Sequence, residues 1–139
     1  MLMNNDLKWK QRFLTFEKTF KVLQRRIDAY KKHPNDEACQ WALVQSFNLI
    51  HGSSWKVLKD YLQYEGVDVY IYDGPKKILR KASQNKLILK IEPWMEAIAK
   101  TKSAMHIYDE NILREVIQFI TVTFHPIVRN LYFQLKKEL

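Results

Sequence analysis

The sequence predicts an all-α protein, an antiparallel up-and-down four-helix bundle with an additional short helix. Two observations lead to this fold class. Glycine and proline are scarce, at three and four residues in a chain of 139, whereas sheets and barrels need frequent tight turns. Apolar residues also recur at alternating intervals of four and three along three long segments, which is typical of helices that pack at a shallow angle. The length fits a single domain over residues 1–139, because one core usually serves a chain of this size.

The first predicted helix has the clearest apolar seam. Its members are Trp9, Phe13, Phe16, Phe20, Leu23, Ile27 and Tyr30. Lysine and arginine side chains fall on the other faces of this helix and give it its charge. Pro34 should end the helix, because proline disfavours helical backbone in the residue that precedes it. Asn35 or Asp36 then caps the next helix.

The second predicted helix runs over residues 36–65 and stops at Gly66, since glycine favours the backbone conformation that ends a helix. It carries two apolar stripes. The first consists of Leu43, Phe47, Ile50, Ser54, Val57 and Tyr61, and the second of Trp41, Val44, Trp55, Leu58 and Leu62. A helix that is apolar on two sides takes a central place in a bundle, or combines a core face with an oligomer face. Gly52 in its middle predicts a bend or a close approach of another helix.

Residues 67–73 alternate between apolar and polar side chains in the manner of a strand. No partner strand exists elsewhere in the sequence, so we expect an extended connector here. Gly74 and Pro75 open a short third helix, since proline is favoured in the first turn of a helix. A fourth helix, also short, is expected over residues 91–100, and a loop over residues 101–108 follows it.

Asp109 is a good N-cap for the last helix. The seam of this helix consists of Leu113, Ile117, Ile120, Phe124, Ile127, Leu131 and Leu135. Pro126 lies inside it and should kink its axis near Val122, because proline removes a helical hydrogen bond and clashes with the preceding turn. The prediction is therefore a bundle of three long helices and two short ones.

The net charge of +8 is spread unevenly along the chain. Residues 1–33 carry a net +6 and residues 74–102 another +6, whereas residues 34–73 carry −4 and residues 103–139 balance. One interpretation is attraction to a polyanion such as RNA, or to an acidic partner subunit. The other is a set of solvated helix faces, and composition alone leaves both open.

The cysteine content and the apolar segments of the sequence indicate the cellular compartment in which the protein is expected. Cys39 is the only cysteine, so no intramolecular disulfide forms and a reducing compartment fits best. The first residues contain no continuous apolar stretch that resembles a signal peptide. The longest uncharged run, residues 38–55, holds too many polar side chains for a membrane span. We therefore expect a cytoplasmic protein with no membrane partner.

Sequence motifs for catalysis are missing. No phosphate-binding glycine loop, zinc-ligand spacing of Cys and His, or Gly-x-Ser-x-Gly elbow is present. We therefore expect no metal, no cofactor and no complete active site in this chain, which favours a binding protein over an enzyme.

Residues 105–109 collect an imidazole, a phenol and a carboxylate close to Lys102. One interpretation is a site for a phosphate or nucleobase, with His106 as a general base towards a ribose hydroxyl. The other is a loop that leads into the last helix, in which Asp109 caps, Tyr108 packs and His106 bonds a backbone carbonyl.

Several runs of residues, in order along the chain, resemble the landmarks of one protein family. The main ones are Lys8-Trp-Lys-Gln-Arg-Phe13, Trp55-Lys-x-Leu-Lys-Asp-Tyr-Leu62, Gly74-Pro-Lys-Lys-Ile-Leu-Arg-Lys-Ala82 and His106-x-Tyr-Asp109. They are similar to those of the nucleotidyltransferase substrate-binding proteins, small helical bundles of the HEPN superfamily. The resemblance spans residues 8–109, and the block at residues 55–62 is its most specific part.

The resemblance implies a four-helix core, a homodimer and a partner chain. That partner is a minimal nucleotidyltransferase, which supplies the metal and nucleotide chemistry in trans while the bundle binds the acceptor substrate. Related pairs behave as toxin–antitoxin systems. The chain would then be a non-catalytic substrate-binding subunit, whose substrate- or nucleotide-binding residues lie on the second helix and before the last one. They are Trp55, Lys56, Lys59, Asp60, Lys102, His106, Tyr108 and Asp109.

Two alternatives stay open. Related HEPN proteins are RNases with an Arg-x(4–6)-His motif, which would make His106 the base and Lys102 the phosphate contact for an RNA substrate. This sequence departs from that motif, because no arginine lies between Arg80 and His106 and lysine does not reproduce the bidentate fork of arginine. The other alternative is a structural bundle that forms a homodimer through the second apolar stripe, where Trp41 and Trp55 lie.

Overall fold

The computed structural model describes residues 2–139, and over these residues it contains helices and connecting turns but no strand. The predicted all-α fold class is confirmed. The helices are α1 (Leu2–Lys32), α2 (Glu37–Tyr64), α3 (Pro75–Gln84), α4 (Glu92–Ser103), α5 (Glu110–Gln118) and α6 (His125–Lys136). A 3₁₀ turn, η1 (Ala104–His106), follows α4, and a π-helical turn, η2 (Phe119–Phe124), joins α5 to α6.

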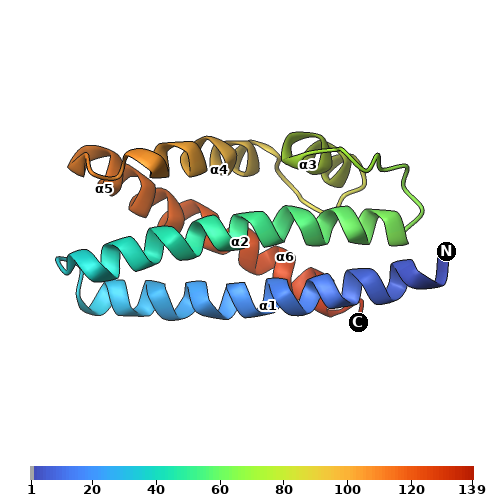
Figure 1. Ribbon diagram of the computed structural model, residues 1–139, viewed down its shortest axis with the longest axis horizontal. Helices are drawn as coiled ribbons and strands as arrows, with labels where there is room; N and C mark the ends of the chain where they lie inside the picture. The colour runs from blue at the N-terminus through green and yellow to red at the C-terminus, as the bar shows by residue number, and fades with distance from the viewer. Residues whose placement is uncertain (1) are drawn as a thin grey trace.

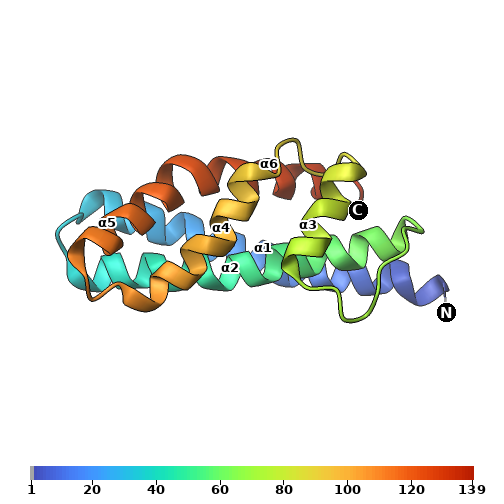
Figure 2. The ribbon, with the colours of Figure 1, turned by 90° about the horizontal axis from the view of Figure 1, so that it is seen from above.

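The helices α1, α2 and α4 and the α5–α6 segment alternate in direction along the long axis of the bundle, whereas α3 runs across it (Figure 1). The long helices α1 and α2 lie antiparallel, and the α5–η2–α6 segment returns towards the end of the molecule where α1 begins. Figure 2 shows that α3 and α4 lie one after the other along the long axis, on the same side of α2, and that both are inclined to this axis. The result is an up-and-down bundle in which one of the four helical positions is divided into two short helices.

The apolar seams meet in one core, as their spacing predicts. Six of the seven seam residues of α1, from Trp9 to Ile27, are almost completely buried, and Tyr30 packs at the edge of the core. The ring of Tyr132, on α6, stacks 4.5 Å from that of Phe20, and the Tyr132 hydroxyl donates a hydrogen bond to Glu17. Aromatic contacts of this kind therefore fix α6 against α1.

The helix ends follow from local chemistry. The Asp36 carboxylate accepts a hydrogen bond from the Ala38 amide at 2.8 Å, and this satisfies one of the free amides at the start of α2. Gly66 follows the end of α2 with a φ of 84°, a conformation that side chains disfavour. Pro75 occupies the first turn of α3, where its missing amide hydrogen is not needed. These boundaries confirm the predicted ones.

Pro126 does not break the last helix. It lies in the first turn of α6, directly after η2, and the carbonyl that loses its usual partner to a proline belongs to Val122. The wider π-helical turn lies at this position and accommodates the proline. The irregularity predicted near Val122 is thus present, in the form of a π-helical turn.

Two local predictions were wrong. Residues 101–108 were expected to form a loop, but α4 continues to Ser103 and η1 to residue 106, because Ala104 is buried and Ile107 packs against the core. Gly52 does not mark a close approach of another helix, since a Cβ atom there would meet nothing within 4 Å. It lies inside α2, which is one uninterrupted helix, and the bend, the other role predicted for Gly52, stays a prediction.

None of the helices in residues 2–139 has a stretch long and apolar enough to cross a membrane.

Candidate functional site

The predicted binding residues fall into two groups, one near the start of α2 and the other in its second half, and Figure 1 shows how far apart along the bundle these parts of the chain lie. One group, Trp55 to Asp60, lies in the second half of this helix. In the other group, Tyr108 lines a groove together with Trp41, near the start of α2. Trp41 and Trp55 are fourteen residues apart, which corresponds to about 21 Å along a helix. The structure therefore does not bring all eight residues into one site.

A groove lies between the α1–α2 turn and the start of α5, and we call it the end groove. Its volume is about 520 Å³. The side chains that line it are Tyr30, Pro34, Asn35, Glu37, Gln40, Trp41, Ile107, Tyr108, Glu110, Leu113 and Arg114. Three aromatic rings line this groove together with charges of both signs. Trp41 is 49% exposed, so its ring is accessible to a planar ligand such as a nucleobase.

Arg114 supplies the positive charge of the end groove. Its Nη2 donates a hydrogen bond to the Asn111 Oδ1 at 2.6 Å, and no carboxylate lies within 4.0 Å of it among the described residues. A guanidinium with free donors suits a phosphate or carboxylate ligand. The sequence interpretation missed Arg114, because it concentrated on the interval between Arg80 and His106. A signal existed in the sequence, because Arg114 follows the motif at residues 106–109 by about one turn of the predicted last helix and so lies close to it.

The residues before α5 take different roles. His106 and Tyr108 are exposed, and the His106 Nδ1 lies 3.3 Å from the Tyr108 hydroxyl oxygen. Lys102 is exposed in the last turn of α4. The Asp109 carboxylate is the N-cap of α5, since it accepts hydrogen bonds from the amides of Asn111 (2.9 Å) and Ile112 (3.4 Å). This confirms the predicted cap and leaves Lys102, His106 and Tyr108 as the polar groups before α5 that a ligand can contact.

Asp60 belongs to an ion pair between α1 and α2. Its side chain is 4% exposed, and its Oδ2 accepts a hydrogen bond from the Arg12 Nε at 2.9 Å. The Lys8 Nζ lies 3.6 Å from its other oxygen. These two cations neutralise a carboxylate that would otherwise be buried without a partner. In this structure Asp60 therefore links two helices.

Lys59 holds the connector that follows α2. Its Nζ donates hydrogen bonds to the carbonyl oxygens of Ile71 (2.6 Å) and Asp73 (3.1 Å), and it lies 6.0 Å from the centroid of the Trp55 ring. Trp55 itself is partly buried against the core. Lys56, in contrast, is exposed and faces a hollow of about 350 Å³ between α1 and α2. Of this group, Lys56 is the side chain most accessible to a ligand.

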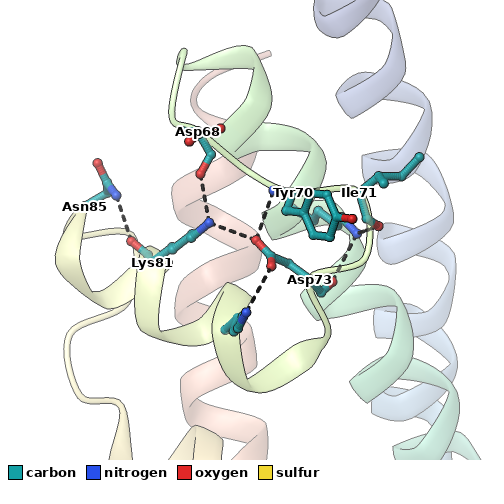
Figure 3. A network of polar contacts seen from close by, with 8 residues as sticks. Asp68, Tyr70, Ile71, Asp73, Lys81 and Asn85 are labelled. Carbon is teal, nitrogen blue, oxygen red and sulfur yellow. Dashed lines mark hydrogen bonds and ion pairs between the residues drawn. The ribbon is translucent and has the colours of Figure 1, made fainter.

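A buried carboxylate organises the connector itself (Figure 3). The Asp73 side chain accepts hydrogen bonds from the Tyr70 amide (3.0 Å) and the Lys81 Nζ (2.8 Å), and the Lys77 Nζ lies 3.8 Å away. Lys81 also donates to the Asp68 carbonyl at 2.8 Å. The hydrogen bond from Lys81 holds the pKa of the Asp73 carboxyl below its usual value.

The sequence interpretation treated residues 67–73 as a plain connector and missed this network. A signal existed, because Lys77 and Lys81 follow Asp73 at intervals of four and eight residues, which places all three on one side of a helix and its preceding turn. The described residues contain no group of three or more His, Cys, Asp or Glu side chains placed to hold a metal ion.

The fold and the end groove define the class of protein: it is an all-helical bundle with a groove lined by aromatic and charged side chains. The family described as nucleotidyltransferase substrate binding protein like matches residues 11–137. The chain belongs to this family, and the match confirms the resemblance read from the sequence. A search of curated proteins finds no match to the chain.

Proposed function

We propose that this chain is the substrate-binding subunit of a two-component nucleotidyltransferase, and that it does not itself transfer the nucleotide. The family supports this proposal, because its description names substrate binding and a nucleotidyltransferase. The catalytic chain is then a minimal nucleotidyltransferase that acts in trans. We further propose that the pair acts in the cytoplasm, as a toxin–antitoxin-like system, and that the bundle forms a homodimer.

The observation that carries the substrate site is the end groove. It combines the accessible rings of Trp41 and Tyr108 with the free donors of Arg114, so it offers both a stacking surface and an anion contact. His106 lies at its margin, beside Tyr108. We propose that the acceptor substrate binds here, with the atom to be modified facing the partner chain.

This site is tested with the partner nucleotidyltransferase, α-labelled ATP and an extract of the host as the source of acceptor. We expect the wild-type subunit to increase the labelled product, and Arg114→Gln to reduce this increase by about tenfold, because one charge-assisted contact contributes about 1.5 kcal/mol. Arg129→Gln on α6 is the matched control, since Arg129 is exposed and lies outside the end groove. Equal effects of the two changes would refute the groove as the acceptor site.

A second candidate function is RNA cleavage, and the exposed His106 is the observation that favours it. In this proposal His106 is the base and Lys102 the phosphate contact. Cleavage of RNA by the purified chain should then disappear in His106→Ala. Intact RNA after incubation with the wild-type chain, while an active HEPN RNase cleaves it under the same conditions, would rule this function out.

A further inference from the structure

A second exposed surface lies at the other end of the bundle from the end groove, where the connector meets α3 (Figure 1). We call it the tyrosine–lysine surface. Its residues are Tyr70, Ile71, Tyr72, Lys76, Lys77 and Arg80. Tyr70 is 59% exposed and Tyr72 is 80% exposed, so these rings contribute little to the core. Their ring centroids lie 5.2 Å apart in an edge-to-face arrangement, so the two rings pack on each other outside the core and form one exposed aromatic patch, which is typical of an interaction site.

The backbone under these rings is fixed. The Asp73 carboxylate bonds the Tyr70 amide and Lys81, and Lys59 bonds the carbonyls on either side of Tyr72 (Figure 3). The connector is thus tied to both α2 and α3 by charge-assisted hydrogen bonds, which are the stronger kind. A ligand that binds the rings would not have to order this segment first, which lowers the entropic cost of binding.

The surface is hollowed on both sides of Tyr70. Two shallow depressions of about 450 Å³ each share Tyr70, Asp73 and Lys77. One of them is also lined by Tyr72 and Lys76, and the other by Arg80 and Lys81. Each depression therefore offers an aromatic ring together with cationic side chains.

The exposed charges of the named residues are all positive, and the exposed Asp68 lies at the edge of the surface, where its carbonyl is bonded to Lys81. Lys76, Lys77 and Arg80 are exposed, and Asp73, the carboxylate nearest to Lys77, is buried beneath them. Neither Lys76 nor Arg80 has a carboxylate within 4.0 Å among the residues that the structure describes. They project from α3 four residues apart, so they lie one above the other on one face of the helix. This arrangement favours a ligand with a repeating negative charge.

We propose that the tyrosine–lysine surface binds single-stranded RNA. Bases stack on the rings of Tyr70 and Tyr72, and Lys76 and Arg80 contact the phosphates, which is how proteins without strong sequence preference hold single strands. An acidic protein also matches the cations, but aromatic rings beside cations on a basic surface favour a ligand in which planar groups and negative charges alternate, as they do along a single strand; docking of a protein is an outcome of the test below. The proposal goes beyond the acceptor site and does not depend on it, because the two surfaces lie at opposite ends of α2.

Fluorescence anisotropy with a fluorescein-labelled single-stranded RNA of mixed sequence tests the proposal. We expect Tyr72→Ser to weaken binding by roughly 5- to 150-fold, which corresponds to the contribution of about 1–3 kcal/mol that one stacking ring makes. The exposed Phe133 on α6 provides the control, and Phe133→Ser should leave the affinity unchanged. Because Tyr72 is mostly exposed, its substitution should not alter the melting temperature.

A pair of charge-matched double variants separates a specific surface from general attraction to a basic protein. Lys76→Gln/Arg80→Gln should weaken binding and reduce the slope of log affinity against log salt by about 1.4, since each phosphate contact on a single strand contributes about 0.7. Lys18→Gln/Arg25→Gln removes the same charge from exposed positions on α1, and it should leave the slope nearly unchanged.

Three results would overturn the proposal. The first is an equal loss in the two double variants, which would show only general electrostatic attraction. The second is no binding of RNA by the wild-type chain at low salt. The third is RNA binding that survives Tyr72→Ser, while the same variant no longer associates with the nucleotidyltransferase, which would make this surface a protein-docking face. Association of the wild-type chain with the transferase is measured separately, so failure here does not refute the proposed function.

Discussion

Lys59→Met separates a structural role of Lys59 from a ligand-binding role. Methionine keeps much of the length and apolar contact of the lysine stem beside Trp55, but it removes the ammonium that holds the carbonyls of Ile71 and Asp73. The structure therefore predicts that this change loosens the connector and lowers the stability of the fold. A lysine that only binds a ligand would leave both unchanged.

The magnitude follows from the two hydrogen bonds, of 2.6 and 3.1 Å. A hydrogen bond to a charged group contributes about 1.5–3 kcal/mol where its partners are desolvated. The bond to Ile71 lies at an exposed position, so water replaces much of it, whereas the bond to Asp73 is partly buried. We expect Lys59→Met to lower the free energy of unfolding by about 2 kcal/mol, which corresponds to a shift of about 1 M in the urea midpoint.

Urea unfolding and amide hydrogen exchange measure the two consequences. Lys56→Met is the control, because Lys56 lies on the same helix, three residues away, and is exposed. It should change the free energy of unfolding by less than about 0.5 kcal/mol. Exchange at the amides of Tyr70 and Asp73, both hydrogen-bonded in the wild type, should accelerate in Lys59→Met alone. Equal midpoints and equal exchange in the two variants would refute the structural role of Lys59.

Three further predictions concern the rest of the bundle. Burial lowers the pKa of His51 from 6.5 to about 4, so the folded protein favours the neutral imidazole. The free energy of unfolding is therefore unaffected by this group above pH 6.5 and declines by up to about 3 kcal/mol as the pH falls towards 4. His51→Leu should flatten the pH dependence of the urea midpoint, and an unchanged dependence would contradict this. Arg12→Gln should lower the free energy of unfolding by about 1 kcal/mol, because it removes a partner of the buried Asp60, while the half-exposed position of Arg12 keeps the loss small. The control Arg25→Gln should leave this free energy unchanged, and similar urea midpoints for the two variants would count against the ion pair between α1 and α2. Trp41→Glu should reduce the labelled product formed with the partner nucleotidyltransferase, as Arg114→Gln does, without a loss of helicity, because it replaces a stacking ring of the end groove by a negative charge; dissociation of the proposed homodimer into a monomer in light scattering would instead place the dimer interface at Trp41 and contradict the groove as the acceptor site.

The fold was predictable because its determinants are local. The seam from Trp9 to Tyr30 repeats with the period of a helix face, and Asp36, Gly66 and Asp109 end or begin helices through contacts with their own neighbours. Local rules were insufficient where tertiary packing decides the outcome. The helical structure continues from α4 through Ala104 because this residue is buried against other helices, and the helix propensities of residues 101–106 do not predict this extension.

The candidate site was predictable only in part, for a related reason. The motif at residues 106–109 identified one end of the bundle, but Trp41 and Arg114 join Tyr108 there through the tertiary fold. Asp60 was predicted to bind a ligand because it belongs to the family-like block at residues 55–62, whereas in the structure it pairs with Arg12, 48 residues away in the sequence. The network around Asp73 combines side chains of α3 with carbonyls of the connector, and a pattern along the sequence does not show such pairings.

The most direct test of the central claim is size-exclusion chromatography with light scattering on the chain purified from its native host, followed by mass spectrometry of the peak. The proposed function predicts that a small nucleotidyltransferase elutes with the bundle in a fixed ratio, at a mass above that of the bundle alone. A bare homodimer, with no nucleotidyltransferase in the peak and none bound when the purified transferase is added, would contradict it.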